Sequence, residues 1–205
     1  MDKKLKRWEV ALMMGLMVAV LAGAWLGEEQ TALADKVIRL HVIANSDSGA
    51  DQILKLAVRD RVLEAAENLY PPGADLEQAR AALEENLEAL AAAGQAEVEA
   101  RGYGYPVTAR LERCWFPTKE YGDFALPAGT YEALRVVIGD GAGENWWCVA
   151  FPPLCLGAAS ETVDEAAQAG LFTDGQAKLI RQEEGYVLKF KCLELLGQLQ
   201  GWLTR

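Results

Sequence analysis

Few side chains in this sequence could carry out nucleophilic chemistry. The chain contains one histidine, His41, so a multi-histidine metal site is impossible within one chain. A cysteine–histidine pair would have to join His41 to Cys148 or Cys155, and nothing near either cysteine marks a reactive thiolate. Ser46 and Ser160 lack the G-x-S-x-G surroundings of a nucleophile elbow. We therefore predict no catalytic residues, no metal site and no cofactor.

Oxygen-rich and glycine-rich segments have simpler interpretations than ligand binding. Asn45–Asp51 lacks the spacing of an EF-hand loop, and turn formation with helix capping explains its residue types. Gly139–Gly143 lacks the strand-then-helix context of a phosphate-binding loop, and we interpret it as a hairpin turn. Glu84-Glu85 and Glu183-Glu184 are expected on solvated helix faces.

The four cysteines are Cys114, Cys148, Cys155 and Cys192. An even number permits disulfides in an exported protein. Cys148 and Cys155 are seven positions apart, so a bridge that closes a short loop is sterically possible. We predict this Cys148–Cys155 disulfide ahead of a Cys114–Cys192 pair, and the alternative is that some cysteines are buried small hydrophobic residues.

Aromatic and polar residues cluster in Phe116–Gly122, Leu126–Tyr131 and Asn145–Cys148. The neighbours Trp146 and Trp147 must face opposite sides of a strand, so one can fill the core while the other needs a cover or lies exposed. Exposed aromatic residues are typical interface anchors, and cover by a helix of the same domain is the alternative. The predicted partner-binding residues are Phe116, Lys119, Tyr121, Asn145, Trp146 and Trp147.

The hydrophobic patterning that must position these residues predicts an α+β fold. The expected strands are Val37–Ile43, Val107–Phe116, Tyr131–Ile138, Asn145–Phe151 and a last one at Tyr186–Phe190. The expected helices are Ala50–Leu69, opened by a capping box at Ser48 and Asp51, then Asp75–Ala93 and Cys192–Leu203. Because Trp147–Phe151 is apolar on both faces, we expect it to be a central strand. The prediction is one domain with a mostly antiparallel sheet packed by two or three helices.

Composition is that of a globular protein, since 51% of the 205 residues are hydrophobic and 24% are charged. Thirty acidic and 20 basic side chains give a net charge of −10. This balance argues against a nucleic-acid partner and against docking of the folded part on anionic lipid.

The N-terminus carries a pattern typical of export. Val10–Gly27 is 18 residues without a charge, about 27 Å as a helix, close to a bilayer core of about 30 Å. Basic residues precede it, at Lys3, Lys4, Lys6 and Arg7. The positive-inside rule then leaves the N-terminus in the cytoplasm and exports the rest.

Two segments, Ala22-Gly23-Ala24 and Ala32-Leu33-Ala34, fit an A-x-A cleavage site. Residues 1–34 are thus expected to be a signal peptide or a membrane anchor. Residues 35–205 are expected to form the exported domain.

Several segments resemble the stage II sporulation protein R family. Val37–Ser48, Asp51-Gln52 and Leu54–Asp60 resemble its start. Phe116–Gly122, Leu126–Tyr131 and Asn145–Cys155 resemble its central motifs. The resemblance spans Val37 to Cys155, and the order of several separate motifs makes it specific.

The resemblance implies a signalling protein of endospore-forming bacteria, made in the forespore and exported into the space between forespore and mother cell. There the family activates a membrane-embedded aspartic protease that removes the pro-sequence of a mother-cell sigma factor. The resemblance supplies no catalytic residues. The alternatives are an exported cysteine hydrolase of the cell envelope and a structural envelope protein held by an uncleaved N-terminal helix.

Overall fold

The computed structural model describes residues 7–121, 124–153, 170, 172–173 and 180. Helices and strands both occur, which confirms the α+β class. The helices are α1 (Arg7–Ala34), α2 (Gly49–Glu67), α3 (Leu76–Glu85) and α4 (Leu87–Ala100). The strands are β1 (Ile38–Ile43), β2 (Val107–Phe116), β3 (Lys119–Tyr121), β4 (Phe124–Leu126), β5 (Gly129–Ile138) and β6 (Asn145–Phe151).

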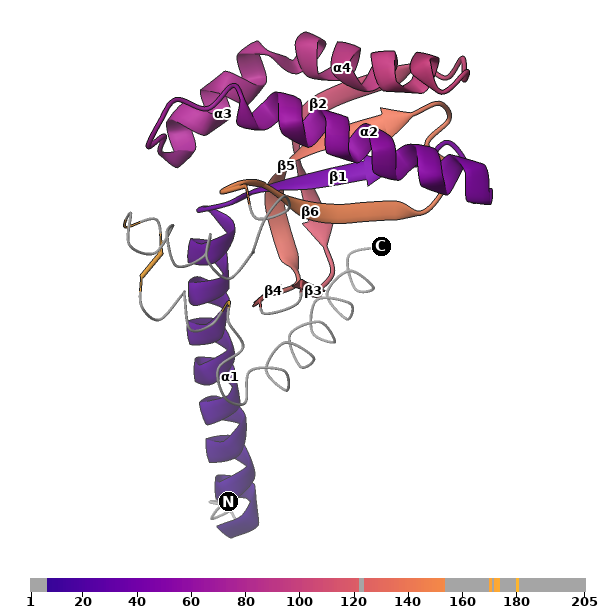
Figure 1. Cartoon of the computed structure of the whole chain (residues 1–205). Helices are drawn as coiled ribbons and strands as arrows, with labels where there is room; N and C mark the ends of the chain where they lie inside the picture. Colours follow the sequence, from indigo (N-terminus) through magenta and orange to yellow (C-terminus); the bar gives the residue numbers. More distant parts are fainter. Residues whose placement is uncertain (1–6, 122–123, 154–169, 171, 174–179, 181–205) are drawn as a thin grey trace.

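The main sheet has four strands in the order β2-β5-β1-β6 (Figure 1). β1 runs parallel to β5 and antiparallel to β6, while β2 and β5 are antiparallel, so the sheet is mixed. The predicted hairpin at Gly139–Gly143 is wrong, because β1 lies between β5 and β6 in the sheet. In the described part of the sheet β6 is an edge strand and β1 is central. Five of the six residues of β1 are buried, as expected of a central strand.

The segment between β5 and β6 crosses the end of β1 instead of forming a hairpin turn. Its backbone interlocks with the residues after β1: the amide of Gly143 donates to the carbonyl of Ala44 at 3.0 Å, and the amide of Asp140 donates to Asn45 Oδ1 at 3.1 Å. Gly139 has a φ of +58°, and a Cβ there would meet the Asn45 side chain. Glycine is therefore required where this connection passes over Asn45.

Helices α2, α3 and α4 cover one face of the sheet, here called the helical face (Figure 1). The core on this side contains alternate residues of β1, including Leu40 and Val42, together with residues of α2 such as Val58. Gly94 lies inside α4, where a Cβ would stand 3.0 Å from Val107 Cγ1 and 3.2 Å from Val58 Cγ1. Gly94 thus allows α4 to approach α2 and β2 closely.

The predicted helix Asp75–Ala93 is two helices, which meet at Asn86. The Asn86 side chain donates through Nδ2 to the carbonyl of Ala82 at 2.8 Å, and its backbone leaves helical geometry with φ −115° and ψ 18°. Asparagine competes with the helical backbone through such bonds, which explains a break at this position.

Only one of the two hydrogen bonds of the predicted capping box forms at the start of α2. Ser48 Oγ accepts from the amide of Asp51 at 3.1 Å. The Asp51 carboxylate does not return to the Ser48 amide; it accepts from Ser46 Oγ at 2.6 Å and from Asn45 Nδ2 at 2.9 Å. These two bonds hold the pKa of Asp51 below its usual range.

The opposite side of the sheet, here called the second face, has its own core. It contains the end of α1, alternate residues of β5 and β6, and a strand pair, β3 and β4. Its fully or nearly buried members are Leu33, Ala34, Val37, Phe116, Leu126, Tyr131, Ala133, Val149, Phe172 and Ile180.

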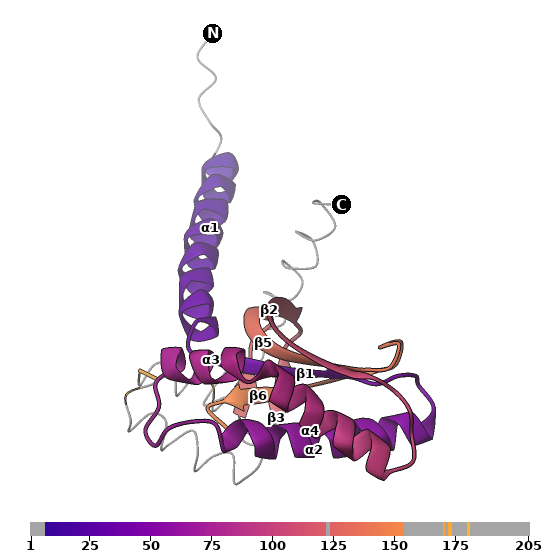
Figure 2. The same cartoon turned by 90° about the horizontal axis from the view of Figure 1, so that it is seen from above.

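From this contact α1 extends away from the sheet (Figures 1 and 2). Apolar side chains along its first half are exposed, among them Leu12, Met14 and Met17. Within the described ranges, no helix combines the length and the apolar character that a membrane crossing requires.

The expectations for Tyr186–Phe190 and Cys192–Leu203 concern segments outside the described residues. They stay predictions, as does the division into residues 1–34 and 35–205.

Candidate partner-binding face

The register of β1 and β6 decides which predicted site residues share a face. His41 is paired with Trp147 and Ile43 with Asn145, so Trp147 and Asn145 lie beside His41 on the second face. Trp146 is paired with Val42 and points to the helical face. The prediction that the two tryptophans face opposite sides therefore agrees with the register.

Arg39 lies at the centre of the second-face core and was missed by the sequence analysis. Its side chain is fully buried, with Nε donating to the carbonyl of Cys148 at 2.9 Å and Nη2 donating to Tyr121 Oη at 2.6 Å. The guanidinium carbon lies 4.3 Å from the Phe116 ring centre and 5.0 Å from that of Tyr131. Such desolvated cation–π contacts contribute about 2 kcal/mol. A signal was present, because Arg39 and His41 alternate with apolar residues in β1.

Tyr121 connects the strand pair to the main sheet. Its hydroxyl accepts from Arg39 and donates to the carbonyl of Trp147 at 3.0 Å. Burial raises the pKa of the Tyr121 phenol, which keeps the hydroxyl protonated and able to donate. Tyr121 thus positions β3 against β6, and its ring is only partly accessible to a partner.

The assignment of Phe116 to a binding surface is wrong. Its side chain is 0% exposed, because β2 points it inward beneath Arg39 and against the edge of Tyr131, with ring centres 5.8 Å apart. Phe116 supports the site from below.

Four residues form the accessible part of the site: His41, Lys119, Asn145 and Trp147. Lys119 Nζ lies 4.5 Å from the centre of the Trp147 ring, a cation–π contact. His41 Nε2 donates to Asn145 Oδ1 at 2.8 Å, which leaves Nδ1 buried and without a hydrogen-bond partner in the part of the chain that is described. Burial lowers the pKa of His41, so the ring is neutral near pH 7. We call these four residues the Trp147 patch.

The charges next to the Trp147 patch are mostly basic, although the chain is acidic overall. Arg110 and Arg135 are paired across β2 and β5 on the second face. Arg135 Nη1 forms an ion pair with Glu112 Oε1 at 3.0 Å, and Arg110 is exposed. This side of the molecule therefore suits an acidic partner surface.

Trp146 belongs to a different surface. Trp146 is 36% exposed, and the guanidinium of Arg59 from α2 lies 4.5 Å from the centre of its ring. Trp146 is therefore an exposed residue that the helical layer contacts but does not bury, which differs from the alternative of cover by a helix.

The cysteines differ from one another. Cys148 is disulfide-bonded, and Cys155 lies outside the described residues, so the Cys148–Cys155 pairing stays a prediction. Cys114 is a free thiol, which rules out the Cys114–Cys192 pair, and burial raises its pKa away from thiolate formation.

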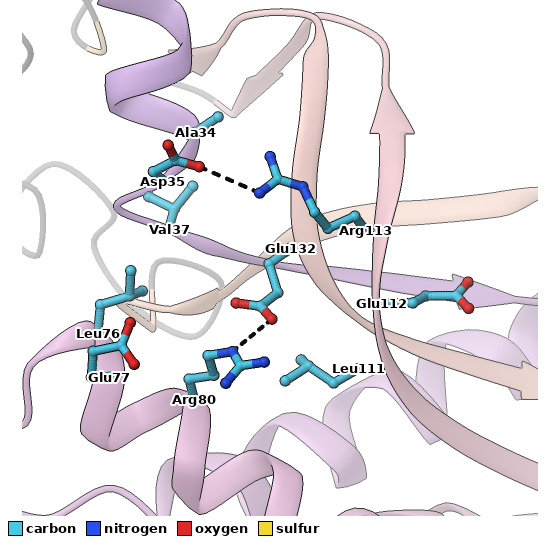
Figure 3. A pocket seen from close by; sticks show the side chains of 10 residues that line it. All are labelled: Ala34, Asp35, Val37, Leu76, Glu77, Arg80, Leu111, Glu112, Arg113 and Glu132. Carbon is cyan, nitrogen blue, oxygen red and sulfur yellow. Dashed lines mark hydrogen bonds and ion pairs between the residues drawn. The ribbon is translucent and has the colours of Figure 1, made fainter.

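A pocket of about 520 Å³ lies where the end of α1 meets α3, β2 and β5 (Figure 3). Two ion pairs line it: Arg80 Nε to Glu132 Oε1 at 2.8 Å, and Arg113 Nη1 to Asp35 Oδ1 at 3.6 Å. Arg113 points toward Asp35 and Arg80 toward Glu132, so these charges satisfy one another. Among the described residues no group of three or more His, Cys, Asp or Glu side chains could hold a metal ion.

A known protein family matches the part of the chain that contains this face. The family model described as stage II sporulation protein R matches residues 34–161. The chain is similar to stage II sporulation protein R of Bacillus subtilis (strain 168), with 37% identity over 148 residues, which are 67% of this chain and 66% of that relative. The chain thus spans about two thirds of that relative's length. No solved structure matches the chain. The chain belongs to the stage II sporulation protein R family.

Proposed function

We propose that this chain is an exported sporulation signalling protein. It activates a membrane-embedded aspartic protease that processes a mother-cell sigma-factor precursor, and it does so by binding and not by catalysis. The observation that carries the proposal is the family match over residues 34–161, which includes β1, β3 and β6 and hence the whole Trp147 patch.

The Trp147 patch is the part of the second face best suited to contact the protease. Trp147 supplies apolar area, and Lys119 lies over its ring while Arg110 and Arg135 add positive charge nearby. Aromatic residues with adjacent basic groups are frequent energetic centres of interfaces. Binding activates the protease only if its active arrangement binds this face more tightly than its inactive one.

Export is the second part of the proposal, and the N-terminal segment is its signal peptide or anchor. Four basic residues precede 18 uncharged residues, and the apolar side chains in the first half of α1 are exposed. The disulfide at Cys148 is typical of a protein outside the cytoplasm. The expected compartment is the space between forespore and mother cell.

The test is co-expression of the full chain with the protease and the sigma-factor precursor, with precursor cleavage read on immunoblots. Lys119→Glu and Trp147→Leu should reduce cleavage at least tenfold. Trp146→Leu is the matched control, because it removes the neighbouring indole from the opposite face, and it should leave cleavage within twofold of the parent. Circular dichroism of the exported variants checks that they fold.

Equal loss of cleavage in Trp146→Leu and Trp147→Leu, with both folded, would show that the second face has no special part in activation. Unchanged cleavage in Lys119→Glu would exclude charge complementarity at this patch. Cleavage of the precursor in cells without this chain would contradict the proposed activation itself.

A further inference from the structure

The last turn of α1 is part of the folded domain. Leu33 is fully buried and Ala34 nearly so, both within the second-face core that also holds Tyr131 and Ala133. The carbonyl of Leu33 also accepts from the amide of Lys36 at 3.0 Å, which closes the turn into β1. Leu33 therefore contributes to the domain in the same way as a residue of β5.

The burial of Leu33 distinguishes between the two candidate cleavage sites, after Ala24 and after Ala34. Hydrolysis after Ala34 would detach Leu33 from the second-face core and leave an apolar gap there. It would also cut the chain at the edge of the pocket where Asp35 faces Arg113 (Figure 3). Hydrolysis after Ala24 would leave Trp25–Ala34, and with it the complete second-face core.

The length of the apolar segment favours the same site. The apolar region of a signal peptide is about 7–15 residues long and ends near small residues. Val10–Leu21 is 12 residues and leads directly into Ala22-Gly23-Ala24. For the downstream site the uncharged run would be 18 residues, and Glu28 and Glu29 would stand between it and the cut.

We infer that the exported protein is processed at the Ala24–Trp25 bond and keeps Leu33 in its mature domain. This inference rests on the proposed export. A membrane-bound signal peptidase would hydrolyse the bond with water, which leaves a carboxylate on Ala24 and an amino group on Trp25. The mature chain would then begin with the ten residues Trp25–Ala34, the last part of α1.

The test is mass spectrometry of the N-terminus of full-length protein expressed in a secreting Gram-positive host, after separation of cytoplasmic and exported fractions. The expected mature terminus is Trp25. Ala24→Phe blocks the small-residue requirement of this site and should leave the exported chain uncleaved. Ala32→Phe, the matched control at an exposed position, should leave the Trp25 terminus unchanged.

Thermal unfolding of the mature protein tests the burial argument separately. Leu33→Ala should lower Tm by about 10 °C, because it opens a gap in the second-face core. Ala32→Ser on the exposed side of the same turn should change Tm by less than about 2 °C. An unchanged Tm in Leu33→Ala would show that burial of Leu33 does not stabilise the domain, and would remove this argument for cleavage after Ala24.

Exported, folded protein that begins at Asp35, or exported protein that retains Met1, would overturn the processing site while leaving export intact. Full-length protein found only in the cytoplasm would overturn both this site and the proposed export.

Discussion

The guanidinium carbon of Arg39 lies 4.3 Å from the centre of the Phe116 ring, and both side chains are fully buried. A buried arginine is usually matched by a carboxylate. No ion pair among the described residues includes Arg39. Aromatic rings and two oxygen acceptors compensate its charge instead, which links β1 to β2, β3 and β6 beneath the Trp147 patch.

Arg39→Lys should destabilise the domain by about 2 kcal/mol. One ammonium group cannot reproduce the two bonds from Nε and Nη2 to Cys148 and Tyr121, and it lacks the flat surface that lies over Phe116. Urea unfolding followed by circular dichroism measures the change. Arg110→Lys, an exposed arginine on the same face, is the control and should shift stability by less than about 0.5 kcal/mol. Equal midpoints for both variants would contradict this role of Arg39.

Gly94→Ala should destabilise the protein by about 1–3 kcal/mol, although alanine is the better helix former. The added Cβ would stand 3.0 Å from Val107 and 3.2 Å from Val58, so α4 would have to move away from α2 and β2. Gly49→Ala is the control, because no atom lies within 4 Å of the added Cβ at the start of α2. Chemical denaturation measures the free energy of unfolding of both variants. A more stable Gly94→Ala would contradict the prediction, because it would show that α4 can move away from α2 and β2 without loss of stability.

Stability should fall as the pH drops through about 6.5, because of His41. Burial lowers the pKa of His41 in the folded state, with Arg135 acting in the same direction and Asn145 and Glu112 against it. The unfolded chain therefore binds the proton first, which favours unfolding below its pKa of about 6.5. Urea midpoints at pH 7.5 and pH 5.5 should differ more in the parent than in His41→Gln.

His41 is the one histidine of the chain, and the carboxyl of Asp51 titrates below its usual range, well under this window. Identical pH profiles for the parent and His41→Gln would mean that His41 keeps its unfolded pKa in the folded protein.

Cys148→Ser and Cys155→Ser should lower the stability of the oxidised protein equally, by about 2–4 kcal/mol, if they form one disulfide. Cys114→Ser, at a half-buried free thiol, should cost less than about 1 kcal/mol. Thermal unfolding with and without reductant measures these effects. Loss of function in Cys155→Ser at unchanged stability would instead favour the cysteine-hydrolase alternative.

Local patterns determined much of the fold in advance. The predicted strands Val107–Phe116 and Asn145–Phe151 agree with β2 and β6, and Ala50–Leu69 agrees with α2 within two residues at each end. Period-two and helical hydrophobic patterns depend on each segment alone, and capping residues such as Ser48 mark its ends.

The pairing of strands, the break at Asn86 and the layout of the site depended on tertiary structure. Nothing in the sequence around Gly139–Gly143 tells a hairpin from a crossing over β1, because glycine suits both; only the insertion of β1 between β5 and β6 decides it. That insertion brings Trp147 beside His41 and turns Trp146 away. The sequence thus selected the residue types of the Trp147 patch, whereas long-range register decided which of them share a surface and which, like Phe116, lie buried beneath it.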